Sequence, residues 1–466
     1  MSFEFPKVSL KQISSKIGDG IHGTPIYDEN GSYYFINGNN LGSGRIVITS
    51  STKKVSRDEY LKHKKELNES TVLLSINGTI GNVALYDNEP IILGKSACYI
   101  NILPDANANY IGYVLKDRLF QHYIKQQANG STIKNVSLKL IRDYEFTLPP
   151  KFVQDRIAEI LSSLDKKISV NGNMSVILEQ MAQALFKSWF VDFDPVKAKM
   201  AVLEAGGSQE DATLAAMTVI SGKDADALAV FEREHPTQYA ELKATAELFP
   251  SAMQESELGA IPKGWGVAAI SEMGKVTCGK TPSKKEPEYY GSDVPFIKIP
   301  DMHGQLFVLK TNEYLSEVGS KSQLKKLVPA NSICVSCIAT IGVVSITNEP
   351  SHTNQQINSV TPHKSSLLYY LYFCMLGLKD HLHILGSAGS ATLNVNTSTF
   401  SGIKIAQPDA KVLELFHAKC THLFNEIKSL SVQTESLTQL RDTLLPKLLS
   451  GKITLPGAEQ IISEEA

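Results

Sequence analysis

A long amphipathic segment occurs twice in this sequence, and this repetition restricts the possible folds more than any other feature. In the first copy, from about Phe152 to Phe190, apolar residues recur in steps of three and four, apart from one gap. The second copy keeps the same register 259 residues later. Steps that average about 3.5 residues are typical of a left-handed coiled-coil seam. We therefore predict two long helices that pack against each other.

The predicted helix–helix seam is made by apolar residues of both copies. At about 1.5 Å per residue, each helix is a rod of roughly 60 Å. The position inside the gap is Asn171 in the first copy and Leu430 in the second, and the stripe includes Met181. An ordinary core helix explains one such segment, whereas two in one register favour a paired rod. The seam residues are Ile157, Leu161, Leu164, Ile168, Leu178, Leu185, Leu423, Ile427, Leu437 and Leu444.

Shorter matches on both sides of the helices extend the repeat to most of the chain. Their offsets stay between 257 and 261 residues, and a proline (Pro149, Pro408) introduces each long helix. Ordered matches at one register indicate an internal duplication. The matching pairs are Gly23–Pro25 with Lys280–Pro282, Leu73–Gly81 with Cys334–Gly342, Asn88–Pro90 with Asn348–Pro350, and Gly130–Ser137 with Gly389–Asn396.

Each repeat has the same predicted plan. Short β-branched and aromatic runs, broken by Gly, Asn and Pro, indicate a curled, mostly antiparallel sheet. One helix is expected inside each β-rich region, near Tyr110–Gln127 and Leu367–Ile384, and the long helix follows. The predicted fold class is therefore α+β, with two β-rich domains in a tandem pseudo-repeat, joined by two long antiparallel helices that form a coiled coil.

The segment between the repeats differs in composition, being rich in Ala and Glu. We predict an acidic connector with one or two short helices, and a disordered linker is the alternative. The tail is expected to be frayed, and the start of the first domain is left open. The predicted segments are 1–150 (first β-rich domain), 151–194 (first long helix), 195–264 (connector), 265–407 (second β-rich domain), 408–452 (second long helix) and 453–466 (tail).

The charge of the chain is unevenly distributed. Residues 201–262 contain eleven acidic and three basic residues, so this segment has a net charge of −8. The whole chain has a net charge of −2, so the remainder has a net charge of +6. A modestly basic remainder is compatible with a phosphate-binding surface. The apolar runs are too short for a membrane span, no secretory signal is visible, and six cysteines form no disulfide framework. We expect a cytoplasmic protein.

Two short motifs resemble ligand sites without the context that such sites need. Gly274–Thr281 satisfies the Walker A pattern, but Pro282 follows directly and no helix is predicted there, so we interpret it as a glycine turn. An enzyme that uses this segment as a nucleotide site remains an alternative. Cys334 and Cys337 form half of a zinc motif with no second pair, so no metal site is predicted.

Polar loops are the remaining candidates for function. No methyltransferase tetrapeptide, nuclease cluster, Ser/His/Asp arrangement or dinucleotide fingerprint is present. Asn and Gln side chains can pair with base edges, and Lys can contact phosphates. The candidate DNA-binding residues are Thr24, Asn37, Asn39, Asn77 and Lys134 in the first repeat, and Thr281, Lys284, Lys285, Lys298, Asn354, Gln355 and Gln356 in the second.

The order of β-rich domain, long helix, β-rich domain and long helix resembles the specificity subunit of type I restriction–modification systems. Besides PPKFVQDRIAEILSSLDKKI (149–168), which opens the first long helix, three segments carry the likeness: QMAQALFKSWFVDFDPVKAKM (180–200), ELGAIPKGW (257–265) and LRDTLLPKLLSGKI (440–453). The chain departs from the family pattern at its start, where KVSLKQIS lacks the lead that precedes the second domain. Inside the β-rich domains the likeness is weak.

The resemblance implies a function for each part. The β-rich domains would be target recognition domains, each reading one half of an asymmetric bipartite DNA site, with the helices setting the spacing. The helices would dock two modification subunits that carry S-adenosylmethionine, and restriction subunits would add ATP- and Mg-dependent cleavage. This chain would bind no cofactor and catalyse nothing. A coiled-coil scaffold whose heads bind protein is the alternative.

Overall fold

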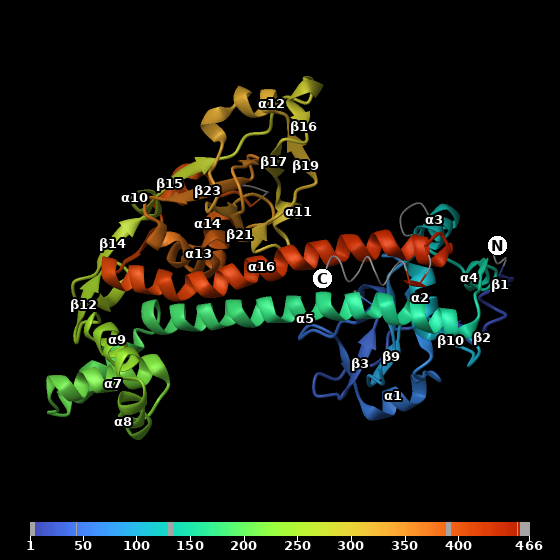
Figure 1. Cartoon of the computed structure of the whole chain (residues 1–466), viewed down its shortest axis with the longest axis horizontal. Helices are drawn as coiled ribbons and strands as arrows, with labels where there is room; N and C mark the ends of the chain where they lie inside the picture. Colours follow the sequence, from blue (N-terminus) through green and yellow to red (C-terminus); the bar gives the residue numbers. More distant parts are fainter. Residues whose placement is uncertain (1–4, 43, 129–133, 388–392, 454, 457–466) are drawn as a thin grey trace. The chain divides into compact units, whose positions relative to one another are not determined.

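The computed structural model describes residues 5–42, 44–128, 134–387, 393–453 and 455–456 (Figure 1). The chain divides into two compact units, Met1–Val170 with Thr434–Ala466, and Asn171–Gln433. Each division falls within a long helix, so each unit holds one β-rich head and half of both helices. We call these heads head 1 and head 2. The predicted tail lies almost entirely outside the described residues.

Head 1 is built on a four-stranded antiparallel sheet in the order β2-β10-β7-β8, beside a three-stranded sheet in the order β6-β3-β9. The two central strands of the first sheet are buried along their whole length, as their β-branched residues predict. The strands are β1 (Lys7–Ser9), β2 (Ser14–Asp19), β3 (Tyr33–Ile36), β4 (Leu41–Gly42), β5 (Arg45–Ile46), β6 (Lys54–Val55), β7 (Thr71–Ser75), β8 (Val83–Leu85), β9 (Ile91–Leu93), β10 (Ala97–Ile102) and β11 (Glu145–Thr147), and the helices are η1 (Gly38–Asn40), α1 (Arg57–His63), α2 (Ala108–Lys116), α3 (Arg118–Gln127) and α4 (Leu138–Arg142).

Head 2 repeats this plan with a five-stranded sheet, β15-β23-β20-β21-β18, and a four-stranded sheet, β16-β19-β17-β22. The strands are β14 (Gly266–Ala269), β15 (Gly274–Cys278), β16 (Tyr290–Gly291), β17 (Val294–Ile297), β18 (Phe307–Val308), β19 (Glu313–Leu315), β20 (Ile333–Ser336), β21 (Val344–Thr347), β22 (His352–Thr353), β23 (Ile357–Pro362) and β24 (Lys404–Gln407). The helices are α10 (Ile270–Met273), η2 (Pro287–Tyr289), α11 (Ile299–Met302), α12 (Glu317–Ser322), η3 (Leu324–Lys326), η4 (Ser365–Leu367), α13 (Leu368–Gly377), α14 (Lys379–Ser387) and α15 (Thr397–Gly402).

Two local predictions for the heads need correction. Each head contains separate sheets rather than one curled sheet, and β3–β9, β17–β22 and β18–β21 are parallel pairs within a mostly antiparallel fold. The single helix predicted in each head is two helices. In head 1 the chain breaks at Asp117, whose carboxylate accepts a hydrogen bond from Leu119 N–H and so caps a new helix. In head 2 the break is at Leu378.

The prediction of two long helices is confirmed. They are α5 (Lys151–Phe190) and α16 (Ala410–Leu449), and α16 continues past Pro446, which lies in its last turn. Within the second unit they run antiparallel, because Asn171 contacts Gln433 at one end and Phe190 packs on Phe416 at the other.

The predicted seam is mostly buried, but it packs on more than the partner helix. In the first unit, Ile157, Leu161, Leu164, Leu437 and Leu444 share one cluster with the core of head 1. The apolar stripe that joins the two helices therefore also packs against the cores of the heads. Met181 is wrong as a seam residue: 55% of its side chain is exposed, and the neighbouring Ala182 is buried instead. The remaining seam residues are buried (Ile427) or partly buried (Ile168, Leu178, Leu185, Leu423).

The connector is a packed helical unit rather than one or two short helices, and the alternative of a disordered linker is wrong. It consists of α6 (Asp194–Glu204), α7 (Gln209–Ser221), α8 (Ala225–Glu234) and α9 (Pro236–Glu247), followed by the hairpin of β12 (Met253–Ser256) and β13 (Gly259–Pro262). Ala216, Met217, Leu228 and Ala246 form its core. None of the described helices is long and apolar enough to cross a membrane.

Candidate nucleic-acid interface

Backbone hydrogen bonds join four segments of head 1 into one surface, which we call loop cluster 1 (residues 20–26, 76–82, 94–96 and 134–137). Gly20 N–H donates to the Ala97 carbonyl at 3.2 Å, and Ile76 N–H donates to the Ser96 carbonyl at 2.9 Å. Val136 N–H then donates to the Ile76 carbonyl at 2.8 Å and attaches the fourth segment. Loops that are distant in sequence are thereby fixed beside one another.

Head 2 repeats these bonds in loop cluster 2 (residues 279–285, 337–343, 354–356 and 393–396). Gly279 N–H donates to the Ile357 carbonyl at 3.1 Å, Cys337 N–H to the Gln356 carbonyl at 2.8 Å, and Val395 N–H to the Cys337 carbonyl at 2.9 Å. Each bond is the equivalent of one in loop cluster 1. The internal duplication therefore extends to individual backbone hydrogen bonds.

A glycine permits the close approach of two loops in each cluster. A Cβ atom on Gly20 would lie 2.0 Å from the Leu93 carbonyl oxygen, and one on Gly279 would lie 2.2 Å from the Asn354 carbonyl oxygen. Both distances are far below van der Waals contact, so any side chain would push the loops apart. Gly279 is part of the segment that matches the Walker A pattern, which gives this glycine a structural role.

Loop cluster 1 brings together three of the five residues predicted for the first repeat. Thr24 and Lys134 are exposed, and Asn77 forms a β-bridge with Asn135, beside Lys134. The sequence reasoning missed Lys95, which is exposed at the tip of the 94–96 loop. Its equivalent at the same loop position in the second repeat is Gln355, so the repeat alignment contained the signal.

Loop cluster 2 contains an exposed amide supported by its neighbours. Thr281 Oγ1 donates a hydrogen bond of 2.6 Å to Oε1 of the exposed Gln355. Asn354 is buried, and its amide is occupied by Gln356, with bonds of 3.0 and 3.1 Å. Asn354 therefore stabilises the loop conformation. Among Asn354, Gln355 and Gln356, Gln355 is the residue whose side chain is exposed to solvent. The exposed Lys280 was also missed.

A buried histidine supports loop cluster 2 from beneath. His352 is fully buried, and its Nε2 lies 2.9 Å from Ser320 Oγ. Burial lowers the pKa of His352 from 6.5 to about 4, so the imidazole is neutral at pH 7. Lys280 N–H donates a hydrogen bond to the carbonyl of Thr353, the residue that follows His352. The buried His352 is therefore linked to the exposed loop at Lys280 through the backbone of Thr353.

The predicted phosphate contacts of the second repeat differ in their surroundings. Lys284 and Lys285 are exposed. Lys298, in contrast, forms an ion pair with Glu313, and its ammonium lies 5.3 Å from the centre of the Phe296 ring. These internal contacts occupy Lys298 and oppose its interpretation as a free phosphate ligand.

Asn37 and Asn39 lie together at a cavity of about 280 Å³ in head 1. Asn37 is connected to loop cluster 1, because its Oδ1 accepts a hydrogen bond of 2.9 Å from Ser96 Oγ. One wall of the cavity is therefore held to loop cluster 1 through Ser96. The cavity is lined by Tyr27, Phe35, Asn37, Asn39, Asn40, Val47, Thr49, Ser51, Thr52 and Lys53.

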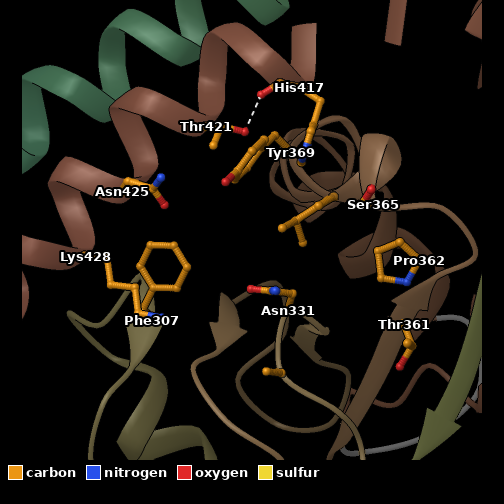
Figure 2. A pocket seen from close by; sticks show the side chains of 12 residues that line it. Phe307, Asn331, Thr361, Pro362, Ser365, Tyr369, His417, Thr421, Asn425 and Lys428 are labelled. Carbon is orange, nitrogen blue, oxygen red and sulfur yellow. Dashed lines mark hydrogen bonds between the residues drawn. The ribbon is translucent and has the colours of Figure 1, made fainter. Parts of the chain in front are cut away.

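A larger cavity of about 470 Å³ lies between head 2 and α16 (Figure 2). The Tyr369 and His417 rings stack there at 4.9 Å, and Lys428 lies 5.7 Å from the centre of the Phe307 ring. None of the predicted DNA-binding residues lines it. This cavity is thus a gap between a head and its helix.

The two ligand-like motifs are parts of β-sheets. Gly274–Cys278 forms strand β15, paired with β23, so the interpretation of this segment as a glycine turn is wrong, and the strand–loop–helix geometry of a P-loop is absent from it. Cys334 lies within β20 and Cys337 follows directly; both are buried, and burial raises the pKa of each thiol to about 11. The described residues contain no group of three or more candidate metal ligands.

Comparison with known proteins agrees with the architecture. The family model "Type I restriction modification DNA specificity domain" matches residues 4–180 and 262–429. The HindI specificity subunit of Haemophilus influenzae is 42% identical over 403 residues, which cover 84% of this chain and 88% of that one. The MjaIX specificity subunit of Methanocaldococcus jannaschii is 23% identical over 390 residues, which cover 83% of this chain and 78% of that one.

Among solved structures, the S subunit of the type I restriction-modification system from M. genitalium aligns with a TM-score of 0.53. The alignment covers 96% of both chains at 16% identity, so it shows that the fold is shared. The family match covers both heads, most of α5 and the first half of α16. This chain therefore belongs to the type I restriction–modification DNA specificity family.

Proposed function

We propose that this chain is the DNA-recognition subunit of a type I restriction–modification complex, and that each head reads one half of an asymmetric bipartite site. The observation that supports this most directly is the pair of loop clusters. The same backbone hydrogen bonds are built twice in one chain, while the exposed side chains on them differ, as with Lys95 and Gln355.

Equivalent scaffolds with different side chains favour two different half-sites. A lysine donates only, whereas a glutamine amide both donates and accepts, so the two tips are complementary to different base edges or phosphates. A pseudo-repeated protein approaches two half-sites from one face of the duplex. The long helices α5 and α16 pass through both units and would set the spacing between the half-sites.

The partners follow from the same proposal. Two modification subunits would dock on the helices and carry S-adenosylmethionine, and restriction subunits would supply ATP- and Mg-dependent translocation and cleavage. This chain would bind no cofactor and catalyse no step, and it would act in the cytoplasm. The protein-binding scaffold remains the competing interpretation of two heads on a rod.

Enrichment from a random duplex pool tests the proposal, using this chain purified together with the subunits that co-purify with it. Two short and different motifs at a fixed separation are the expected result. A single contiguous motif would mean that one head alone reads DNA. A folded complex that enriches no sequence would refute DNA recognition and favour the scaffold.

A further inference from the structure

The cavity in head 1 offers the three kinds of group that a single nucleotide needs. Its aromatic side is formed by Tyr27 and Phe35, whose ring centres lie 6.0 Å apart. Amides come from Asn37 and Asn39, and Lys53 supplies a cation. Stacking surface, hydrogen-bonding amides and a phosphate ligand are thus gathered around about 280 Å³.

The orientation of the Asn37 amide follows from its neighbours. Ser96 Oγ accepts a hydrogen bond from Gly38 N–H at 2.9 Å, so its own proton is available to donate to Asn37 Oδ1. Asn37 Nδ2 therefore remains to donate to a ligand. A Cβ on Gly94 would lie 2.3 Å from Asn37 Oδ1, so the glycine at this position makes room for the amide.

Tyr27, Asn39 and Lys53 are accessible from solvent. Asn39 and Lys53 are exposed, and 44% of Tyr27 is exposed. The Lys53 ammonium lies 5.9 Å from the centre of the Tyr27 ring and forms no ion pair with any residue that the structure describes. Its charge is therefore available to a phosphate that approaches the ring.

Head 2 has the same backbone at this place but carries an ion pair there. Asn37 N–H donates to Asn40 Oδ1 at 3.0 Å, and the equivalent Lys298 N–H donates to Asp301 Oδ2 at 2.9 Å. Phe35 N–H donates a backbone hydrogen bond to the Lys53 carbonyl, and the equivalent Phe296 pairs with Glu313 between β17 and β19. Where head 1 has an amide and a free lysine, head 2 has the Lys298–Glu313 ion pair over the Phe296 ring.

We propose that the cavity lined by Tyr27, Asn37, Asn39 and Lys53 is a nucleotide-reading pocket that is open in head 1 alone. One base of the target DNA lies against Tyr27 with its edge facing the side-chain amides of Asn37 and Asn39, and the adjoining phosphate contacts Lys53. This inference rests on the DNA-recognition function proposed above and assigns one nucleotide of the head 1 half-site to this pocket.

The test uses the assembled complex and enrichment from a random duplex pool, followed by binding measurements on the selected site. Asn39→Ala should relax the choice of base at one position of one motif, with a loss of discrimination of about tenfold to hundredfold. Lys53→Ala should weaken binding to all sequences alike and lower the salt slope by about 1. Asn39 and Lys53 are exposed, so neither change disturbs the core.

A double variant closes the pocket with the ion pair of head 2. Asn37→Lys together with Lys53→Glu should abolish selection at the same position while the second motif and the circular dichroism spectrum stay unchanged. The matched control is Lys298→Ala with Glu313→Ala in head 2, which should leave the first motif intact.

The outcomes separate this proposal from the function on which it rests. If the unmodified complex selects no sequence, DNA recognition itself fails and the pocket with it. If it selects two motifs and Asn39→Ala and the double variant leave both unchanged, the pocket proposal alone is overturned. It is also overturned if the head 2 control alters the position that Asn39→Ala alters.

Discussion

Asn171 Nδ2 donates a hydrogen bond of 2.7 Å to Gln433 Oε1, which joins α5 to α16 through two side-chain amides. Asn171 is buried and Gln433 is exposed. At the position equivalent to Asn171 the second helix carries Leu430. A polar pair at one position of an apolar seam favours a single register, since any shift would leave the buried amide without its partner.

Removing one partner of the Asn171–Gln433 pair should reduce stability more than replacing both partners. Gln433→Ala leaves the buried Asn171 amide without this bond and should lower the free energy of unfolding by about 1–2 kcal/mol. Asn171→Leu combined with Gln433→Ala should restore most of that loss, because a leucine needs no partner. Urea unfolding of the unmodified chain and the two variants checks this, and a double variant less stable than Gln433→Ala would contradict it.

Asp165 holds head 1 to both long helices. Its carboxylate accepts from Tyr113 Oη at 2.8 Å and from Arg441 Nη1 at 2.7 Å, and Lys116 Nζ lies at 3.6 Å. Asp165→Asn removes the charge that compensates two partly buried cations, and we expect the free energy of unfolding to fall by about 2 kcal/mol, discounted for partial exposure.

Asp442→Asn is the matched control for Asp165→Asn, since Asp442 pairs with the same Arg441 but its side chain is 56% exposed. Its expected cost is below about 0.5 kcal/mol. Equal costs for the two variants, measured by urea unfolding, would show that the partial burial of Asp165 contributes nothing.

The effect of a glycine-to-alanine change in the loop clusters should depend on how closely the glycine approaches a neighbouring loop. Gly279→Ala places a methyl group 2.2 Å from the Asn354 carbonyl oxygen, whereas Gly23→Ala meets no atom within 4 Å. We expect the first to cost about 2–3 kcal/mol of stability and to displace the Gln355 loop, and the second to cost less than about 0.5 kcal/mol. Thermal unfolding compares them, and a Gly279→Ala protein as stable as Gly23→Ala would contradict the close approach.

His352 predicts a loss of stability in acid. Its pKa is lowered to about 4 in the folded chain from 6.5. Between these values the unfolded chain binds a proton that the folded chain does not, so stability is complete above pH 6.5 and decreases as the pH falls. At pH 5 the loss amounts to about 2 kcal/mol.

Urea unfolding at pH 7 and pH 5 measures this contribution, with His352→Gln as the comparison. The variant should be less stable at pH 7, because the contact with Ser320 changes, but its stability should depend less on pH. Identical pH dependence in the two proteins would show that His352 carries none of the effect.

Local periodicity was sufficient for the elements whose pattern repeats over many residues. The stripe from Ile157 onward predicted α5 and α16 along their whole length, because forty residues of one period outweigh Gly172 and Pro446. The same pattern was wrong at Met181, since a step of three or four does not specify whether that residue or Ala182 faces the core. Short elements were less certain: Asp117 divides one predicted helix by capping the next.

The candidate interface shows a similar division. Repetition in the sequence indicated the loops, and the structure brings Asn77 beside Lys134 and Thr281 beside Gln355. Side-chain availability was not predictable, because it depends on which partners the folded chain brings within hydrogen-bonding or ion-pairing distance. The Asn354 amide forms a hydrogen bond with Gln356 in its own loop, and the Lys298 ammonium forms an ion pair with Glu313.

The sequence by itself determined the duplication, the paired long helices and the family, because periodicity and repeated motifs are properties of neighbouring residues. Only the tertiary structure decided which of two equivalent positions is open. Asn37 and Lys298 occupy the same backbone site, but one faces a cavity beside a free lysine and the other an opposite charge. That difference arises from Lys53, which directly precedes β6 and accepts a backbone hydrogen bond from Phe35, and from Glu313 in β19, which pairs with Phe296. Pairings of this kind between separate strands form only when the chain folds.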